Sequence, residues 1–204
     1  VSDVQLAGGT TRDSTRFTWP TLAPLSNVGE SRGYTGRAVY ADGQVSGTYG
    51  ASMGELPFEF DLRRPVFPSA ALPLIVRGIP LTPGYEAVVP TFAATERFKE
   101  ATLSVVGPEM VTLPDGSEVE AVAIDQTGGG GALAGPFSLR HYVDADTRQL
   151  VMTTFQPQPT MTIQIVPMTA EVDAMMAAEA EQEAMAAEAA AGTNLSPGHP
   201  DLVA

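Results

Sequence analysis

The sequence predicts a mostly β protein, a curved antiparallel meander or half-barrel with one short packed helix, followed by a long acidic C-terminal helix. Three observations support this fold class. Residues 1–167 are punctuated by Pro and Gly and contain short runs in which apolar and polar side chains alternate. One apolar stretch within them has the character of a short helix. Residues 170–191 consist mainly of Ala, Glu and Met without Gly or Pro, a composition typical of a helix.

These observations divide the 204 residues into four parts. Residues 1–14 are small and polar, and we expect an extended N-terminal arm. Residues 15–168 form the predicted antiparallel β domain. Residues 169–192 form the acidic helix, and residues 193–204 an extended C-terminal tail. One domain with an appendage suits a chain of this length.

The first predicted β elements are a hairpin and a half-buried strand. The hairpin covers residues 34–49, because Asp42 and Gly43 supply the positive φ angles of a tight turn between two β-rich runs. Residues 55–62 alternate strictly between apolar and acidic side chains, apart from Pro57, which indicates an edge strand or a strand start. The apolar side of this strand contains Leu56, Phe58, Phe60 and Leu62.

A short helix is predicted from Ser69 to Arg77, with Ser69 as its N-cap and residues 78–80 (Gly-Ile-Pro) ending it. Its apolar character on nearly every side predicts burial against a sheet. Six strands at the spacing of an antiparallel meander follow it. They cover residues 85–92, 98–106, 118–125, 137–143, 149–155 and 161–167, with turns at 114–116, 128–131 and 144–146.

The terminal helix is expected to begin near Thr169 and to end near Gly192. Its apolar face is thin, so its stability would come from packing against another surface. Its methionines suit an adaptable contact surface, although helix propensity and core filling explain them equally well. The candidate partner-binding residues are Val172, Met175, Met176, Glu179, Glu183 and Met185.

The charge distribution limits the possible partners. The net charge is −13, and all 11 basic residues lie at or before Arg148 with 17 of the 24 acidic ones. The remaining seven acidic residues follow Arg148 without a Lys or Arg. This field repels nucleic acid and favours a basic protein surface. No apolar run is long enough to span a bilayer, and the absence of cysteine excludes disulfides and thiolate chemistry.

The candidate chemical motifs each have a simpler structural explanation. Residues 128–131 (four Gly) lack the Lys-Ser/Thr ending and following helix of a phosphate-binding loop. His141 with Asp144 and Asp146 lacks further ligands for a metal, and it alternates with apolar residues of a strand. Glu118 and Glu120 fit a solvated strand face better than an acid–base pair. We therefore expect no catalytic, metal or cofactor site, and no enzyme.

Three turn motifs support a family resemblance over residues 72–166. They are a Gly-x-Glu step at 107–109, a Pro-x-Gly turn at 114–116 and an Asp-x-x-Thr-Arg hairpin at 144–148. Together with residues 72–81 (LPLIVRGIPL) and the following Gly-Tyr, they resemble a family of bacterial envelope proteins of unknown function, similar to the LolA-type curved half-barrel. The resemblance implies a fold whose concave face can hold an apolar, lipid-like ligand.

Two functions are predicted from these features. The first is a non-enzymatic, membrane-extrinsic accessory subunit that stabilises a membrane protein complex on the periplasmic side. A photosynthetic reaction-centre–antenna assembly is the host that we expect. The alternative is a periplasmic half-barrel that binds or carries a lipid-like ligand. The sequence opens at Val1 without an initiator Met or an apolar leader. Either a targeting segment has been removed or the sequence begins inside a longer chain, and we favour export.

Overall fold

The computed structural model describes residues 2–6, 9–18, 21–31, 34–51, 54–94, 97–129, 138–158 and 161–166. The described residues all lie in one compact unit, Val1–Val166. The predicted acidic helix over 169–192 and the tail over 193–204 lie outside the described residues. Within the described part, the prediction of a mostly β fold with one short helical segment is confirmed.

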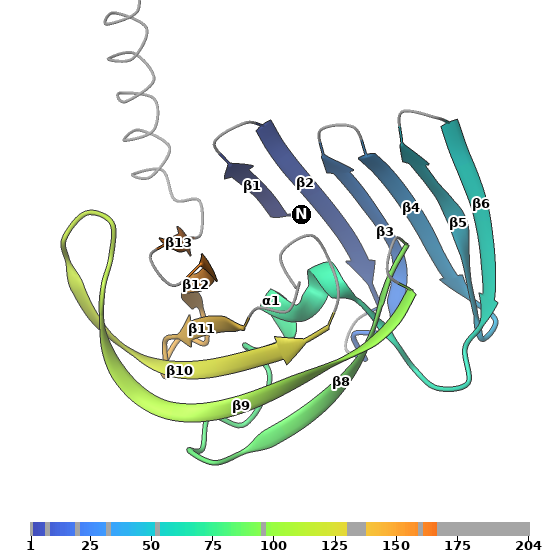
Figure 1. The fold of residues 1–204 in the computed structure, drawn as a ribbon. Coiled ribbons are helices and arrows are strands. Elements are labelled where there is room, and N and C mark those ends of the chain that lie inside the picture. Colours follow the sequence, from blue (N-terminus) through green and yellow to red (C-terminus); the bar gives the residue numbers. More distant parts are fainter. Residues whose placement is uncertain are drawn as a thin grey trace, which may run out of the picture. The chain divides into compact units, whose positions relative to one another are not determined.

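The strands form two sheets instead of one continuous meander (Figure 1). The first has six antiparallel strands in chain order: β1 (Ser2–Leu6), β2 (Gly9–Phe17), β3 (Pro24–Ser31), β4 (Tyr34–Ala41), β5 (Gln44–Ala51) and β6 (Gly54–Asp61). The second has seven: β7 (Phe67–Pro68), β8 (Glu86–Ala93), β9 (Arg97–Thr112), β10 (Glu118–Gly128), β11 (Leu139–Val143), β12 (Leu150–Gln158) and β13 (Met161–Ile165). Among the described strands, the β7–β8 pair alone is parallel.

The change of sheet occurs after Asp61. The residues 62–66 between β6 and β7 belong to no strand and include Pro65, which lacks the N–H that a continuing ladder would need. Local alternation gave no sign of this break, because both sheets are built from hairpins of the same kind.

The N-terminal segment is part of the first sheet. Residues 1–14 were expected to form an extended arm, but β1 and β2 pair as a hairpin from Ser2↔Asp13 to Leu6↔Gly9. β2 then pairs with β3, a strand that we did not predict. Backbone pairing thus overrides the weak local strand signal of a segment that contains Gly, Ser and Asp.

The hairpin predicted over 34–49 is confirmed as β4 and β5. Its turn residues Asp42 and Gly43 have φ angles of 52° and 74°, as a tight turn of this hand requires. β6 is the edge strand of the first sheet, as Pro57 indicated. Its apolar side is only partly covered, because Phe58 is buried while Leu56 is 55% exposed.

The helical segment packs on the second sheet. It consists of a 3₁₀ turn, η1 (Ser69–Ala71), and a short α-helix, α1 (Leu72–Ile75), so the predicted helix exists but is shorter than expected. Ser69 is not its side-chain cap; the Ser69 hydroxyl donates to the carbonyl oxygen of Gly129 at 2.8 Å. The apolar cluster that joins helix and sheet contains Leu72, Val76, Ile79, Val89, Leu103, Val105 and Ile124.

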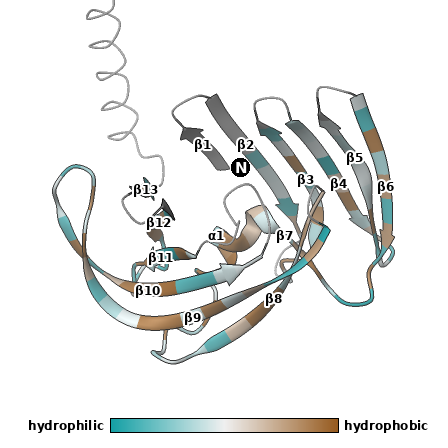
Figure 2. Cartoon of the chain, viewed as in Figure 1, coloured by the Kyte–Doolittle hydropathy of each residue, from teal (hydrophilic) through white to brown (hydrophobic). Residues whose placement is uncertain are grey.

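The second sheet is strongly curved along β9 and β10 (Figure 1), and α1 is hydrophobic like much of the middle of β9 (Figure 2). β9 is 16 residues long, and its pairing with β10 shifts register between Ala123 and Ile124. A bulge of this kind bends a strand and increases its twist. The side chains of the short helical segment pack against the apolar side of this sheet at β8, β9 and β10.

A second apolar cluster combines residues of both sheets. Tyr40 and Phe58 of the first sheet contact Phe92 of the second, with ring centroids 6.5 Å and 5.4 Å apart. Phe60 contacts Phe98 at 5.8 Å. Such aromatic pairs contribute about 0.5–1.5 kcal/mol each beyond the area that they bury, so these rings are a major contact between the β6 end of one sheet and the β8–β9 end of the other.

Two of the turn motifs that carry the family resemblance stabilise local structure. In the Pro-x-Gly turn, the Asp115 carboxylate accepts from the backbone N–H of Ser117 at 2.9 Å and from its hydroxyl, while Gly116 has a φ of 84°. In the Asp-x-x-Thr-Arg hairpin, Asp144 accepts from the backbone N–H and the hydroxyl of Thr147. These bonds hold the pKa of each aspartate below its usual range.

Candidate binding site

The buried histidine belongs to a satisfied polar network. His141 is 1% exposed. Its Nε2 lies 2.8 Å from Gln126 Oε1, and its Nδ1 lies 2.8 Å from the Thr153 hydroxyl. Because Gln126 Oε1 can only accept, Nε2 carries the proton and the hydroxyl donates to Nδ1. Burial lowers the pKa of His141 to about 4 against a smaller opposing effect of Asp125, so the ring is neutral at pH 7.

The Gly-x-Glu step takes part in an ion cluster on the second sheet. Arg140 donates to both carboxylate oxygens of Asp125, at 2.6 Å and 2.9 Å, and to Glu109 at 3.2 Å. These side chains are each about one-third exposed, at 34–37%. The bidentate bond to Asp125, the largest cause, raises the pKa of Arg140. The cluster connects β9, β10 and β11 and is structural.

The other residues considered in the sequence lie at solvated or packed positions in the part of the chain that the structure describes. Glu118 and Glu120 are both exposed, as a solvated strand face predicts. Among the described residues no group of His, Cys, Asp or Glu could hold a metal ion. The carbonyl of Gly129 accepts from Ser69 and from Thr91, so this end of the Gly-rich segment is part of the packing.

The predicted partner-binding residues lie outside the described part of the chain. They are Val172, Met175, Met176, Glu179, Glu183 and Met185. Their proposed role therefore stays a prediction, and the candidate site of the described part has to be sought elsewhere.

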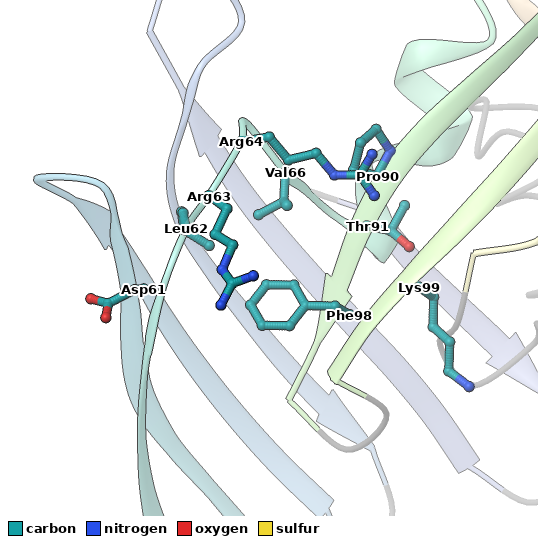
Figure 3. Close-up of a pocket in the computed structure, with 9 residues that line it drawn as sticks. All are labelled: Asp61, Leu62, Arg63, Arg64, Val66, Pro90, Thr91, Phe98 and Lys99. Atoms are coloured by element: carbon teal, nitrogen blue, oxygen red, sulfur yellow. The ribbon is translucent and has the colours of Figure 1, made fainter.

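A cavity of about 240 Å³ lies beside the inter-sheet aromatic cluster (Figure 3). We call it the Arg63 pocket. It is built by the end of β6, the linker that follows, and strands β8 and β9. Its lining residues are Asp61, Leu62, Arg63, Arg64, Val66, Pro90, Thr91, Phe98 and Lys99.

The charged side chains of the Arg63 pocket differ in their surroundings. Arg64 pairs with Glu100 of β9 at 2.5 Å, and Asp61 accepts from the Gln44 side chain at 2.9 Å. Neither Arg63 nor Lys99 makes a side-chain hydrogen bond or ion pair with any residue that the structure describes. The Arg63 guanidinium points toward the Phe98 ring, whereas Asp61 points away from it (Figure 3).

The Phe98 ring supplies an apolar surface at the same place. It is 43% exposed and is held from behind by Phe60 and Phe92, the latter at 5.3 Å. The guanidinium of Arg97 lies over the Phe60 ring, 4.6 Å from its centroid. The pocket therefore combines a fixed aromatic surface with an available guanidinium, which can bind a group that is both anionic and partly apolar.

Sequence analysis missed this site because its parts are separated along the chain. Arg63 and Arg64 follow the strand over 55–62, and Phe98 and Lys99 begin another strand. One signal was present, since two adjacent arginines between a β strand and Pro65 are unusual in a chain of net charge −13. Their convergence with Phe98 depends on the packing of the two sheets, which no local pattern predicts.

The described part of the chain is thus a mostly β domain with two sheets, a short packed helix and a small basic–aromatic pocket. The profile of the family described as "Protein of unknown function (DUF3108)" matches residues 2–158. The chain therefore belongs to the DUF3108 family. No match was found among the curated proteins or among the solved structures. Among the described residues, no helix has the length and apolarity to cross a bilayer.

Proposed function

We propose that the protein is a non-enzymatic, membrane-extrinsic accessory subunit that docks on a membrane protein complex on the extracytoplasmic side. The charge distribution carries this proposal. Seven of the 13 net negative charges belong to residues after 166, beyond the compact unit that ends at Val166 and beyond the family match over 2–158. A concentrated charge outside the family domain is suited to selecting a basic partner surface.

The proposed contact residues have two roles. Val172, Met175, Met176 and Met185 supply apolar contact, for which flexible thioethers are well suited. Glu179 and Glu183 select a basic neighbour, which affects the association rate and the choice of partner more than the final affinity. A photosynthetic reaction-centre–antenna assembly is the kind of host that we propose.

Native purification tests the accessory role. The chain should co-migrate with a membrane complex in mild detergent at low salt, and it should separate as the ionic strength rises, because exposed charges more than about 10 Å apart are largely screened at 0.1 M salt. A monodisperse monomer at every salt concentration, with residues 167–204 readily removed by protease, would contradict the proposal.

The second candidate function is binding of a lipid-like ligand, as the likeness to a LolA-type half-barrel suggested. The apolar side of the curved sheet is occupied by the helix at β8–β10, so the support for this function comes from the Arg63 pocket. An aromatic ring 43% exposed within a cavity is the specific observation. Mass spectrometry of organic extracts from the purified protein tests it, and extracts without any amphiphile would count against it.

A further inference from the structure

We propose that the Arg63 pocket binds the head of an anionic amphiphile, meaning a phosphate monoester or carboxylate carried on a short apolar chain or ring. This inference rests on the second candidate function and names the chemistry of its ligand. It is independent of the accessory role and of residues 167–204.

The charges of the pocket favour an anion. Three of its nine lining residues are basic and one is acidic, although the chain as a whole carries −13. Arg64 pairs with Glu100, whereas the guanidinium of Arg63 has no ion pair with any described residue. A guanidinium presents its N–H groups in a planar fork that matches two oxygens of a carboxylate or phosphate. Arg63 is therefore the residue that we expect to contact the anion.

The apolar part of the ligand has a defined place beside Arg63. Phe98 presents its exposed ring next to the guanidinium (Figure 3), and Leu62, Val66 and Pro90 complete the apolar lining. Phe60 and Phe92 hold the ring in position, so binding does not have to order it. A preordered surface lowers the entropic cost of binding.

Lys99 lies at the far rim of the pocket. Its ammonium group points away from Phe98 and Arg63 (Figure 3), so it adds to the positive field without sharing the anion. Asp61 opposes that field from the other side. We therefore expect Lys99 to raise the affinity for an anion and Asp61 to lower it, and the Asp61 variant below tests the second effect.

The volume limits how much of the ligand enters. About 240 Å³ is below the ~300–1,000 Å³ of pockets that enclose drug-sized ligands. We therefore expect a head group and a few carbons to be bound, with any longer chain outside the cavity.

Calorimetric titration at low ionic strength with three probes tests the ligand class. Hexyl phosphate should bind roughly tenfold or more tightly than either inorganic phosphate or hexanol, because only it uses both halves of the pocket. If inorganic phosphate bound as tightly as hexyl phosphate, the pocket would be a simple anion site and the proposal of an amphiphilic ligand would be wrong. If hexanol bound as tightly as hexyl phosphate, the ligand would not need an anionic head, although the ligand-binding function itself would stand. No binding of any probe would overturn both.

Three variants locate the site. Arg63→Gln should weaken hexyl phosphate roughly tenfold and leave hexanol unchanged. Arg37→Gln is the matched control, since it makes the same charge change at an exposed position of β4 outside the pocket lining. Asp61→Asn should strengthen hexyl phosphate, because it removes the one negative charge of the lining. Equal effects of the Arg63 and Arg37 changes, or weaker binding in Asp61→Asn, would overturn the assignment.

Discussion

The Nε2–H of His141 donates to the side-chain oxygen of Gln126 across 2.8 Å, inside a sheet where both residues are at most 2% exposed. The Thr153 hydroxyl satisfies the other ring nitrogen. A histidine held in this way is part of the core, and its burial has a direct consequence for stability at acid pH.

We predict that the protein loses stability as the pH falls from about 6.5 to about 4. The unfolded histidine, with a pKa of 6.5, takes up a proton below that pH, while burial keeps the folded ring neutral until about pH 4. Protonation over this window therefore favours the unfolded state, by about 3 kcal/mol in total. The free energy of unfolding, measured in urea between pH 4 and pH 7.5, checks this.

The variant His141→Gln separates this effect from the titration of carboxylates. It will be less stable at pH 7, because the network loses its ring contacts, but its stability should fall less steeply below pH 6.5. Parallel pH profiles of the two proteins would show that His141 does not carry the effect.

A second prediction concerns the Asp-x-x-Thr-Arg hairpin. Arg148 has a φ of 59°; its guanidinium donates to the carbonyl of Ile79 at 2.8 Å, and its own carbonyl accepts from Arg77 at 2.8 Å. Arg148→Ala should destabilise the fold by about 1–2 kcal/mol, because the Ile79 carbonyl loses its donor while the strained backbone remains.

Arg148→Gly distinguishes the two causes. It removes the same side chain but tolerates a positive φ, so we expect it to be more stable than Arg148→Ala by about 1 kcal/mol. Thermal or urea unfolding of both variants measures the difference. Equal stabilities would mean that backbone strain at this position is negligible.

A third prediction concerns the close approach of β10 to β9 at Gly128. An added Cβ at this position would lie 2.4 Å from the carbonyl oxygen of Glu100, and the φ is 72°. Gly116 has a similar φ of 84° but open space around it. Gly128→Ala should therefore cost about 2 kcal/mol or more, and Gly116→Ala only the conformational part, about 1 kcal/mol. Similar losses in both variants would contradict the steric explanation.

Local patterns predicted the parts of this fold that depend on short-range chemistry. The hairpin at 34–49 followed from Asp42 and Gly43, and the strands after residue 85 followed from alternation and turn residues. The short helix followed from its apolar run, although the role of Ser69 as a cap was wrong. Strands β1, β2 and β3 were missed because their Ser, Asp, Gly and Asn residues have weak strand propensity and are ordered by pairing.

The division into two sheets and the Arg63 pocket were beyond local prediction for one reason. Both depend on which distant segments meet, as when Phe60 of β6 contacts Phe98 of β9. The cost of closing such long loops and the gain from packing aromatic rings are properties of the whole fold. The proposed contact residues of the acidic segment lie outside the described residues and stay predictions.

Charge reversal in the acidic segment tests the central claim, that this segment selects the partner. Glu179→Lys with Glu183→Lys should abolish co-migration with the membrane complex at low salt. The matched control is Glu118→Lys with Glu120→Lys, which makes the same change of charge at two exposed positions of β10 and should leave co-migration intact. Retention of both double variants in the complex, or loss of both, would contradict the account.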